Sequence, residues 1–252
     1  MARAAVFAFG VISYLVFLAS FVYAIGFVGG FLTPTSLDAA PTMTLPQALA
    51  IDLALLAAFA IQHSGMARPA FKTWWTKIVP PAAERSAYVL LSSLCMIVLF
   101  MFWQPIGGVI WEAPEGWQRM AVIGLNLFGW LFLLYATFLI NHFDLFGLTQ
   151  VWRRLADQPY GEPTFRTPSL YRLMRHPIYV GWLIIFWSAP TMTVAHLVFA
   201  VVTTLYILVA IQLEEHDLIR QFGKDYTDYK KRTPMLVPGL GGRSSAAPVQ
   251  QE

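Results

Sequence analysis

The chain has 252 residues, of which 57% are hydrophobic and 12% are charged. Soluble domains carry about 25% charged residues, so this composition excludes an ordinary soluble protein and indicates a chain that lies mainly in lipid. The net charge of +3 is too small to indicate a nucleic-acid partner. The single cysteine, Cys95, excludes an intramolecular disulfide and lies in an apolar run typical of a packed free thiol, so no metal site is expected.

Four apolar runs come first along the chain. A helix needs about 20 apolar residues to cross ~30 Å of hydrocarbon, and residues 6–31, 45–62, 86–103 and 120–140 meet or approach that length. The first run is longer than the apolar part of a signal peptide, so we interpret it as a retained membrane helix. The second run is broken only by Asp52.

A fifth run, residues 177–213, contains no Asp, Glu, Lys or Arg and is too long for one crossing. Pro190 interrupts it, which favours a helical hairpin with its turn at 188–193. The first arm is short unless its helix begins upstream, around 169–174. The sequence therefore predicts an all-α integral membrane protein with about six transmembrane helices, or five if the 177–213 hairpin does not fully cross.

The basic residues predict the orientation of these helices. With the N-terminus in the cytoplasm, every Lys and Arg except Arg119 falls on the cytoplasmic side, which is the positive-inside pattern. We expect both termini in the cytoplasm and the chain in a bacterial inner membrane. Three parts follow: membrane helices in 1–140 with a cytoplasmic loop at 64–85, then a loop, hairpin and polar segment in 141–238, and a disordered tail at 239–252.

Polar side chains near the expected helix ends have two interpretations each. Asp52, within a span, either bonds a neighbouring helix or faces a cavity. His63 ends that span and Glu84 and Arg85 begin the next, which favours a structural clamp across the loop, although a catalytic role for His63 stays open.

Another histidine follows the fourth span. His142 lies two residues before Asp144, and an imidazole beside a carboxylate is oriented and made more basic, as a general base requires. The alternative is an ordinary helix end, in which Asn141 is a cap and His142 bonds the backbone.

Charged residues also mark both ends of the hairpin. Arg175 and His176 precede it, whereas Glu214 and Glu215 follow it, and the two ends of one hairpin lie close together. Cytoplasmic segments favour Lys and Arg, so topology does not explain two adjacent carboxylates there. They are either solvated helix ends or the acceptors of a cationic ligand.

Ordered motifs frame the hairpin. Before it stands Arg175-His176-Pro177-x-Tyr179-x-Gly181, and after it stand Glu214-Glu215-x-x-Leu218 and Phe222-Gly223-x-x-Tyr226-x-x-Tyr229-x-x-Arg232-x-Pro234. This pattern resembles the isoprenylcysteine carboxyl methyltransferase and phospholipid methyltransferase superfamily. Sterol reductases share a related hairpin but typically carry His-Asp-Glu-Arg where this chain has Glu-Glu. The longer layout is similar to the bacterial methanethiol S-methyltransferase family through His63-Ser64, Glu84-Arg85, Asn141-His142-Phe143-Asp144-Leu145-Phe146-Gly147 and Gln150.

The resemblance implies a membrane enzyme that methylates methanethiol to dimethyl sulfide with S-adenosyl-L-methionine, and it makes 141–238 the catalytic region. It assigns to the cofactor Arg175, His176, Pro177, Tyr179, Gly181, Glu214, Glu215, Tyr226, Tyr229 and Arg232. We expect the two glutamates to accept from the ammonium or ribose, and Arg175 or Arg232 to pair with the carboxylate. Gly181 is expected to let a ligand approach the helix backbone.

The thiol has to lose its proton before it attacks a methyl carbon. We expect His142, oriented by Asp144, as the first candidate base and His63 as the second; desolvation beside the sulfonium, with no dedicated base, is the alternative. Phe143, Phe146 and Trp182 are expected to wall a small apolar pocket for methanethiol.

Two other functions stay open at this point. One is methylation of a prenylcysteine carboxylate or a phospholipid headgroup, which needs a groove open to the bilayer. The other is a non-catalytic membrane protein of the denitrification-associated type, which resembles the N-terminal half. That group is expected to lack the Glu-Glu and Tyr-x-x-Tyr segments, which are present here.

Overall fold

The structure, a computed structural model, describes residues 2–161 and 164–239. The tail expected to be disordered, 239–252, lies outside the described residues except for Gly239. Among the described residues, five helices are long and apolar enough to cross a membrane: α1 (Arg3–Gly29), α2 (Leu45–Ala67), α4 (Pro81–Phe102), α5 (Trp117–Ile140) and α10 (Val194–Phe222). The all-helical membrane architecture and the four N-terminal spans are thereby confirmed.

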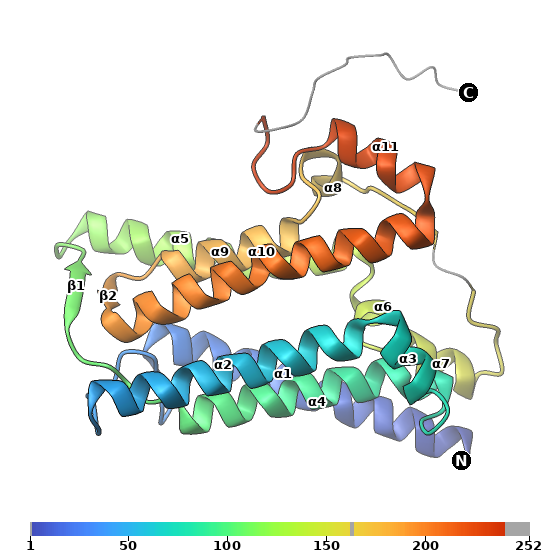
Figure 1. Cartoon of the computed structure of the whole chain (residues 1–252), viewed down its shortest axis with the longest axis horizontal. Helices are drawn as coiled ribbons and strands as arrows, with labels where there is room; N and C mark the ends of the chain where they lie inside the picture. Colours follow the sequence, from blue (N-terminus) through green and yellow to red (C-terminus); the bar gives the residue numbers. More distant parts are fainter. Residues whose placement is uncertain (1, 162–163, 240–252) are drawn as a thin grey trace.

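Shorter elements gather at the two ends of this bundle (Figure 1). One end carries the strands β1 (Val109–Glu112) and β2 (Thr191–Thr193), which pair antiparallel. The other end carries most of the short helices: α3 (Pro69–Trp75), α6 (His142–Leu145), α7 (Leu148–Leu155), α8 (Leu170–Leu173) and α11 (Lys224–Arg232). The beginning of α1 and the whole of α11 lie at this second end, in keeping with termini on one side of the membrane.

The first arm of the hairpin is the helix α9 (Pro177–Trp187), and it has only 11 residues. At about 1.5 Å per residue it covers roughly half of the hydrocarbon, so the expected sixth transmembrane helix is absent from the described residues and the five-helix alternative holds. The chain conformation explains why α8 and α9 do not join. His176, which precedes Pro177, has φ −127° and ψ 61°, because a residue before proline avoids the α region. From Ser188 to Pro190 the chain is not helical, and it then enters β2 at the end of the bundle that carries the two strands.

Close packing holds α9 in place. A Cβ at Gly181 would lie 2.9 Å from the Leu133 Cα of α5, so the two helix backbones touch there. Ile185, fully buried, follows one turn later. The long helix α10 packs on the other side of α9, and its 29 residues extend ~43 Å, more than the hydrocarbon thickness. Its last turns therefore project from the bundle, carrying Glu214 and Glu215 to the end with the short helices.

Candidate active site

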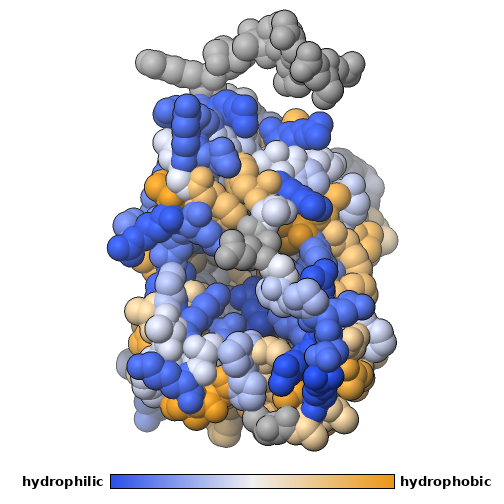
Figure 2. All heavy atoms as spheres, turned by 90° about the vertical axis from the view of Figure 1, so that its right-hand side faces the viewer, coloured by the Kyte–Doolittle hydropathy of each residue, from blue (hydrophilic) through white to orange (hydrophobic). Residues whose placement is uncertain are grey.

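The end of the bundle with the short helices is polar. Figure 2 shows this end face-on, with hydrophilic side chains gathered over it around a hollow near the middle. Most of the residues expected to bind the cofactor come from α9, α10 and α11, which meet here.

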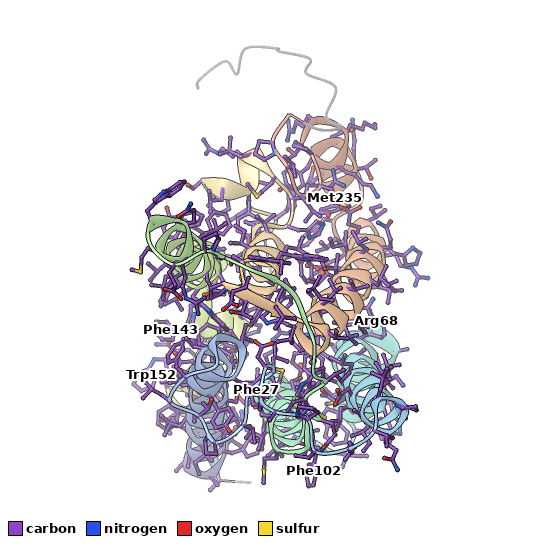
Figure 3. The ribbon with its side chains drawn as sticks, turned by 90° about the vertical axis from the view of Figure 1, so that its left-hand side faces the viewer. Phe27, Arg68, Phe102, Phe143, Trp152 and Met235 are labelled. Atoms are coloured by element: carbon purple, nitrogen blue, oxygen red, sulfur yellow. The ribbon has the colours of Figure 1, made fainter. Side chains whose placement is uncertain are left out.

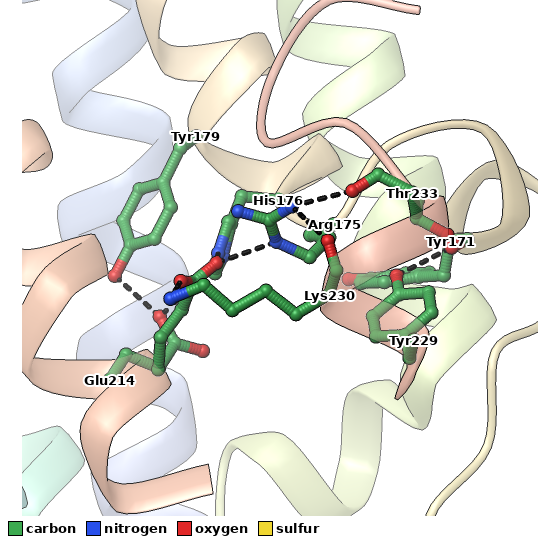
Figure 4. A network of polar contacts seen from close by, with 9 residues as sticks. Tyr171, Arg175, His176, Tyr179, Glu214, Tyr229, Lys230 and Thr233 are labelled. Atoms are coloured by element: carbon green, nitrogen blue, oxygen red, sulfur yellow. Dashed lines mark hydrogen bonds and ion pairs between the residues drawn. The ribbon is translucent and has the colours of Figure 1, made fainter. Parts of the chain in front are cut away.

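Glu215 is the centre of a buried ionic cluster, whose other members Arg175, His176 and Lys230 are labelled in Figure 4. Its side chain is 2% exposed, and its Oε1 accepts from Arg175 Nε at 2.6 Å and lies 3.0 Å from His176 Nε2. Its Oε2 lies 2.6 Å from Lys230 Nζ. Both carboxylate oxygens are therefore satisfied by the protein itself, so Glu215 joins α10 to α11 and to the start of α9.

Arg175 is equally occupied. One guanidinium nitrogen donates to Glu215, and another donates to the carbonyls of Lys230 and Thr233. The backbone N–H of Arg175 donates to Pro234 O at 2.9 Å, and that of His176 to Met235 O at 3.2 Å. This set closes the C-terminal segment over the hairpin. The pairing of Arg175 with a cofactor carboxylate, expected from sequence, finds no support in this geometry.

Glu214 differs from its neighbour. Its side chain is 44% exposed, and its Oε2 accepts from the Tyr179 hydroxyl at 3.0 Å. Among the described residues, Oε1 of Glu214 has no hydrogen-bond donor. The carboxylate is thus held in place on one side and available to a ligand cation or hydroxyl on the other.

Tyr226 supplies a second open polar group. The residue is 2% exposed, and its hydroxyl is buried with no hydrogen-bond partner in the part of the chain that the structure describes. Burial and the nearby Glu215 and Glu214 charges raise its pKa, so the hydroxyl keeps its proton and can donate. Tyr229, one turn on, instead donates to the Tyr171 carbonyl, and burial raises its pKa to about 12.

The remaining expected cofactor residues have other surroundings. Pro177 is the buried first residue of α9, a position where its missing N–H costs nothing. Gly181 faces Leu133 rather than open space, so the structure gives it a packing role instead of the expected ligand approach. Arg232 is exposed on the last turn of α11.

His63 lies where α2 reaches α10. Its Nε2 is 2.9 Å from the Tyr88 hydroxyl and its Nδ1 is 3.2 Å from the Ser92 hydroxyl. The next residue, Ser64, bonds Tyr206 of α10 at 3.0 Å, and Arg68 donates to the Leu213 carbonyl, one residue before Glu214. The ring of His63 thus bonds α4, while its neighbours Ser64 and Arg68 on α2 bond α10 close to Glu214.

The expected clamp around His63 forms only in part. The guanidinium of Arg85 lies 5.0 Å above the Tyr88 ring, and Tyr88 in turn bonds His63. Oε1 of Glu84 is buried without a partner among the described residues, so this carboxylate does not complete the set. Asp52, which like His63 is on α2, accepts from the Gln104 N–H at 2.8 Å through Oδ1, which supports its structural interpretation, while its buried Oδ2 has no partner among the described residues.

His142 is not oriented by Asp144, contrary to the expectation from sequence. Its ring nitrogens bond the Tyr14 hydroxyl and the Thr137 hydroxyl, both at 2.9 Å, whereas Asp144 accepts from the Tyr160 hydroxyl at 2.9 Å. The two residues belong to the single turn of α6, and residues two apart on a helix face in nearly opposite directions. Burial lowers the pKa of His142 and keeps its imidazole neutral.

The three aromatic residues expected to wall a pocket do not meet. Phe143 is half exposed and lies at the edge of the molecule, whereas Phe27 lies inside the bundle (Figure 3). Phe146 stacks on Phe17 with centroids 3.9 Å apart, and Trp182 packs on Trp130 and Phe186 in the core. Aromatic residues fill helix interfaces as well as pockets, so their presence in the sequence could not distinguish the two.

Sequence reasoning missed several members of this region. Lys230 has the pattern that could have revealed it, since Tyr226, Tyr229, Lys230 and Thr233 follow the i, i+3, i+4, i+7 spacing of one helix face. Tyr88, Ser92 and Tyr206 lie inside apolar spans, and nothing in their spacing distinguishes them from packing residues.

The open groups suit S-adenosylmethionine. S-adenosylmethionine carries an ammonium group and a ribose diol, which a carboxylate can bind. It also carries several hydrogen-bond acceptors, which a buried hydrogen-bond donor can bind. The free side of Glu214 and the unpartnered Tyr226 hydroxyl are of these two kinds, and they lie on adjoining helices around the ionic cluster of Glu215. The residues present therefore fit this methyl donor, with Glu214 in the role that sequence gave to both glutamates.

Fold and polar cluster together define a helical integral membrane protein with a buried ionic cluster and open polar groups at one end of its bundle. Comparison with known proteins finds a methanethiol S-methyltransferase from Crocosphaera subtropica that is 49% identical over 97% of this chain and 96% of its own. Another from Mycobacterium tuberculosis is 47% identical over 91% of this chain and 94% of its own. The chain belongs to the methanethiol S-methyltransferase family.

A more distant relative is nurim from Rattus norvegicus, 33% identical over 68% of this chain and 68% of its own. No family model and no solved structure matches the chain. The resemblance of the longer layout to the methanethiol S-methyltransferase family is thus confirmed.

Proposed function

We propose that this chain transfers a methyl group from S-adenosylmethionine to methanethiol and releases dimethyl sulfide. The reaction takes place at the end of the bundle that carries Glu214, which we assign to the cytoplasmic face of a bacterial inner membrane. The observation that carries the proposal is the half-exposed Glu214 carboxylate, fixed by Tyr179 beside an ionic cluster that needs no ligand. The names of the relatives from Crocosphaera and Mycobacterium support methanethiol as acceptor.

When bound, S-adenosylmethionine supplies an electrophilic methyl group on a positively charged sulfur. The chain's own task is to hold that cation and to remove the thiol proton. Glu214 is suited to the first task, because a carboxylate attracts the charged groups of the donor. Placing thiol sulfur and methyl carbon in line removes much of the entropic barrier to transfer.

His63 is better placed than His142 to take the thiol proton. The helix turn that carries His63 contacts α10 beside Glu214, whereas His142 bonds α1 and α5. The proton passes from the thiol sulfur to His63 and from there to water at the polar end. The sulfur uses the electron pair left by that proton to form its new bond to the methyl carbon.

The direct test is dimethyl sulfide in the headspace above purified protein, S-adenosylmethionine and methanethiol, read by gas chromatography. We expect dimethyl sulfide only when both substrates are present. A folded protein that binds S-adenosylmethionine but methylates a prenylcysteine or a phospholipid instead would contradict the proposed acceptor.

Two histidine variants test the assignment of the base. His63→Ala should lower kcat by ~100-fold or more, within the usual range for general bases, while the KM for S-adenosylmethionine stays near the wild-type value. His142→Ala should act mainly on stability, because it removes the partner of the part-buried Tyr14 hydroxyl and one of the two bonds of the buried Thr137 hydroxyl, which still donates to the Leu134 carbonyl. A larger loss of kcat in His142→Ala than in His63→Ala would reverse the assignment.

A further inference from the structure

A pocket of about 230 Å³ lies between α2 and α4, one helix turn away from His63. Its walls are formed by Leu55, Ala58, Phe59 and Gln62 of α2 and by Leu91, Leu94, Cys95 and Val98 of α4. Both helices are membrane spans, and Leu94 and Val98 are 44% and 46% exposed. The pocket therefore opens sideways, toward the hydrocarbon of a bilayer, and not toward the polar end.

The wall nearest the site is shared with His63. The Phe59 ring stacks on the His63 ring at 5.1 Å, and Ser92, next to Leu91, bonds His63. A single aromatic ring thus separates the pocket from the histidine to which we assign the thiol proton. Phenylalanine side chains can rotate about χ1, so this separation is a gate of one residue.

One side chain of the pocket lining, Gln62, carries an amide group. Gln62 Nε2 donates to the Met66 sulfur at 3.1 Å, while its Oε1 is buried with no hydrogen-bond donor among the described residues. A buried acceptor without a donor is unfavourable. Apart from Gln62 and the Cys95 thiol, the lining is hydrocarbon, so the pocket suits a small neutral molecule with an apolar body, such as a neutral thiol.

The size of the pocket argues in the same direction. Sites for drug-sized ligands occupy about 300–1,000 Å³, so 230 Å³ suits a molecule of a few heavy atoms and not a prenyl chain. We propose that the pocket between α2 and α4 binds a small neutral thiol from the bilayer and passes it by Phe59 to His63. This inference rests on the proposed function and adds the binding site and route of its acceptor.

Two neighbouring alanines of α2 allow a matched kinetic test. Ala58 and Ala57 are both exposed, but only Ala58 lines the pocket. In nanodiscs, Ala58→Phe should raise the KM for methanethiol by about tenfold and leave kcat and the KM for S-adenosylmethionine nearly unchanged. Ala57→Phe should behave as the wild type. Equal KM values for the two variants would overturn the route.

A second measurement does not depend on turnover. Methyl methanethiosulfonate attaches a methylthio group to the one cysteine of the chain, Cys95, at a rate that mass spectrometry can follow. Dimethyl sulfide, which is small, apolar and inert to this reagent, should slow the labelling of wild type severalfold, and Ala58→Phe should abolish this protection. Absence of protection in the wild type would overturn the pocket as a binding site.

The two measurements separate this inference from the proposed function. If no dimethyl sulfide forms from methanethiol but the protection of Cys95 is seen, the acceptor is wrong and the pocket for small sulfur compounds stands. If labelling is slow in nanodiscs, fast in short-chain detergent and insensitive to dimethyl sulfide, a lipid acyl chain fills the pocket and the inference fails.

Discussion

At the scale of single residues, the site depends on two adjacent glutamates with opposite surroundings. Successive residues of a helix differ in direction by about 100°. Glu215 therefore points into the junction of α9 and α11, while Glu214 points toward the exposed surface of the polar end. Glu215 has three donors, Arg175, His176 and Lys230, and Glu214 has one, Tyr179. The first stabilises the fold, and the second remains available to a ligand.

The Tyr226 hydroxyl provides a prediction at this scale. Tyr226→Phe should weaken binding of S-adenosylmethionine by about 1 kcal/mol, a fivefold rise in Kd, because one buried hydrogen bond is lost. The same change removes an unpartnered buried hydroxyl, so the melting temperature without ligand should stay the same or rise. Calorimetric titration and thermal unfolding measure the two effects.

Tyr229→Phe is the matched control, since Tyr229 already bonds the Tyr171 carbonyl. It should lower the melting temperature and leave the affinity for S-adenosylmethionine unchanged. Equal affinities for Tyr226→Phe and wild type would remove Tyr226 from the binding site.

Sequence could predict the kinds of residue in the site better than their partners. The Arg-His-Pro and Glu-Glu motifs come together as expected, because a hairpin brings its two ends close whatever its tilt. Spacing alone could not reveal that Arg175 pairs with Glu215 instead of a ligand, nor that Asp144 faces Tyr160 instead of His142. Those pairings depend on how each helix is rotated about its own axis. The few non-helical residues that connect the helices set this rotation.

At the scale of elements, the hairpin is asymmetric because of its prolines and glycines. Pro177 prevents α8 and α9 from joining, and Gly181 lets α9 lie directly on α5. The hydropathy of the run 177–213 could not show that its first arm is only 11 residues long, since the helix could also have begun upstream, around 169–174. The other spans were predictable because a backbone in lipid has to bond within its own helix.

The contact at Gly181 gives a prediction for this scale. Gly181→Ala places a methyl group 2.9 Å from the Leu133 Cα, so it should destabilise the protein by about 1–3 kcal/mol, as overpacking does. Gly124→Ala is the control, because a Cβ at this position of α5 meets no atom within 4 Å. Alanine at an exposed helical glycine should raise stability slightly. Thermal unfolding in detergent measures both variants. Equal melting temperatures of Gly181→Ala and Gly124→Ala would contradict the packing role of Gly181.

At the scale of the whole molecule, the fold separates a polar end from an opposite end closed by β1 and β2 (Figure 1). A water-soluble methyl donor can reach the polar end directly, while a small apolar thiol can also arrive through lipid. We propose that the polar end faces the cytoplasm, because the basic residues gather there. The sequence predicts that orientation from the placement of its charges, without reference to packing.

Cysteine accessibility tests this orientation. In a Cys95→Ala background, Lys224→Cys places a thiol at the start of α11, and Glu115→Cys places one at the opposite end, where the Glu115 side chain is 86% exposed. A membrane-impermeant maleimide should label Glu115→Cys in spheroplasts and reach Lys224→Cys only after the membrane is opened. The reverse pattern would place the site outside the cell.

The measurement that most directly tests the assignment of the site is the affinity of Glu214→Gln for S-adenosylmethionine. Titration calorimetry measures it, with Asp228→Asn as the control variant. Charge-assisted hydrogen bonds contribute about 1.5–3 kcal/mol, so Glu214→Gln should bind at least tenfold more weakly than wild type. Its melting temperature without ligand should be nearly unchanged, whereas Glu215→Gln should unfold at a lower temperature. Asp228→Asn, which alters a surface pair with Lys231, should bind normally. If Glu214→Gln retains wild-type affinity, the ligand site does not lie at Glu214 and the proposed site is wrong.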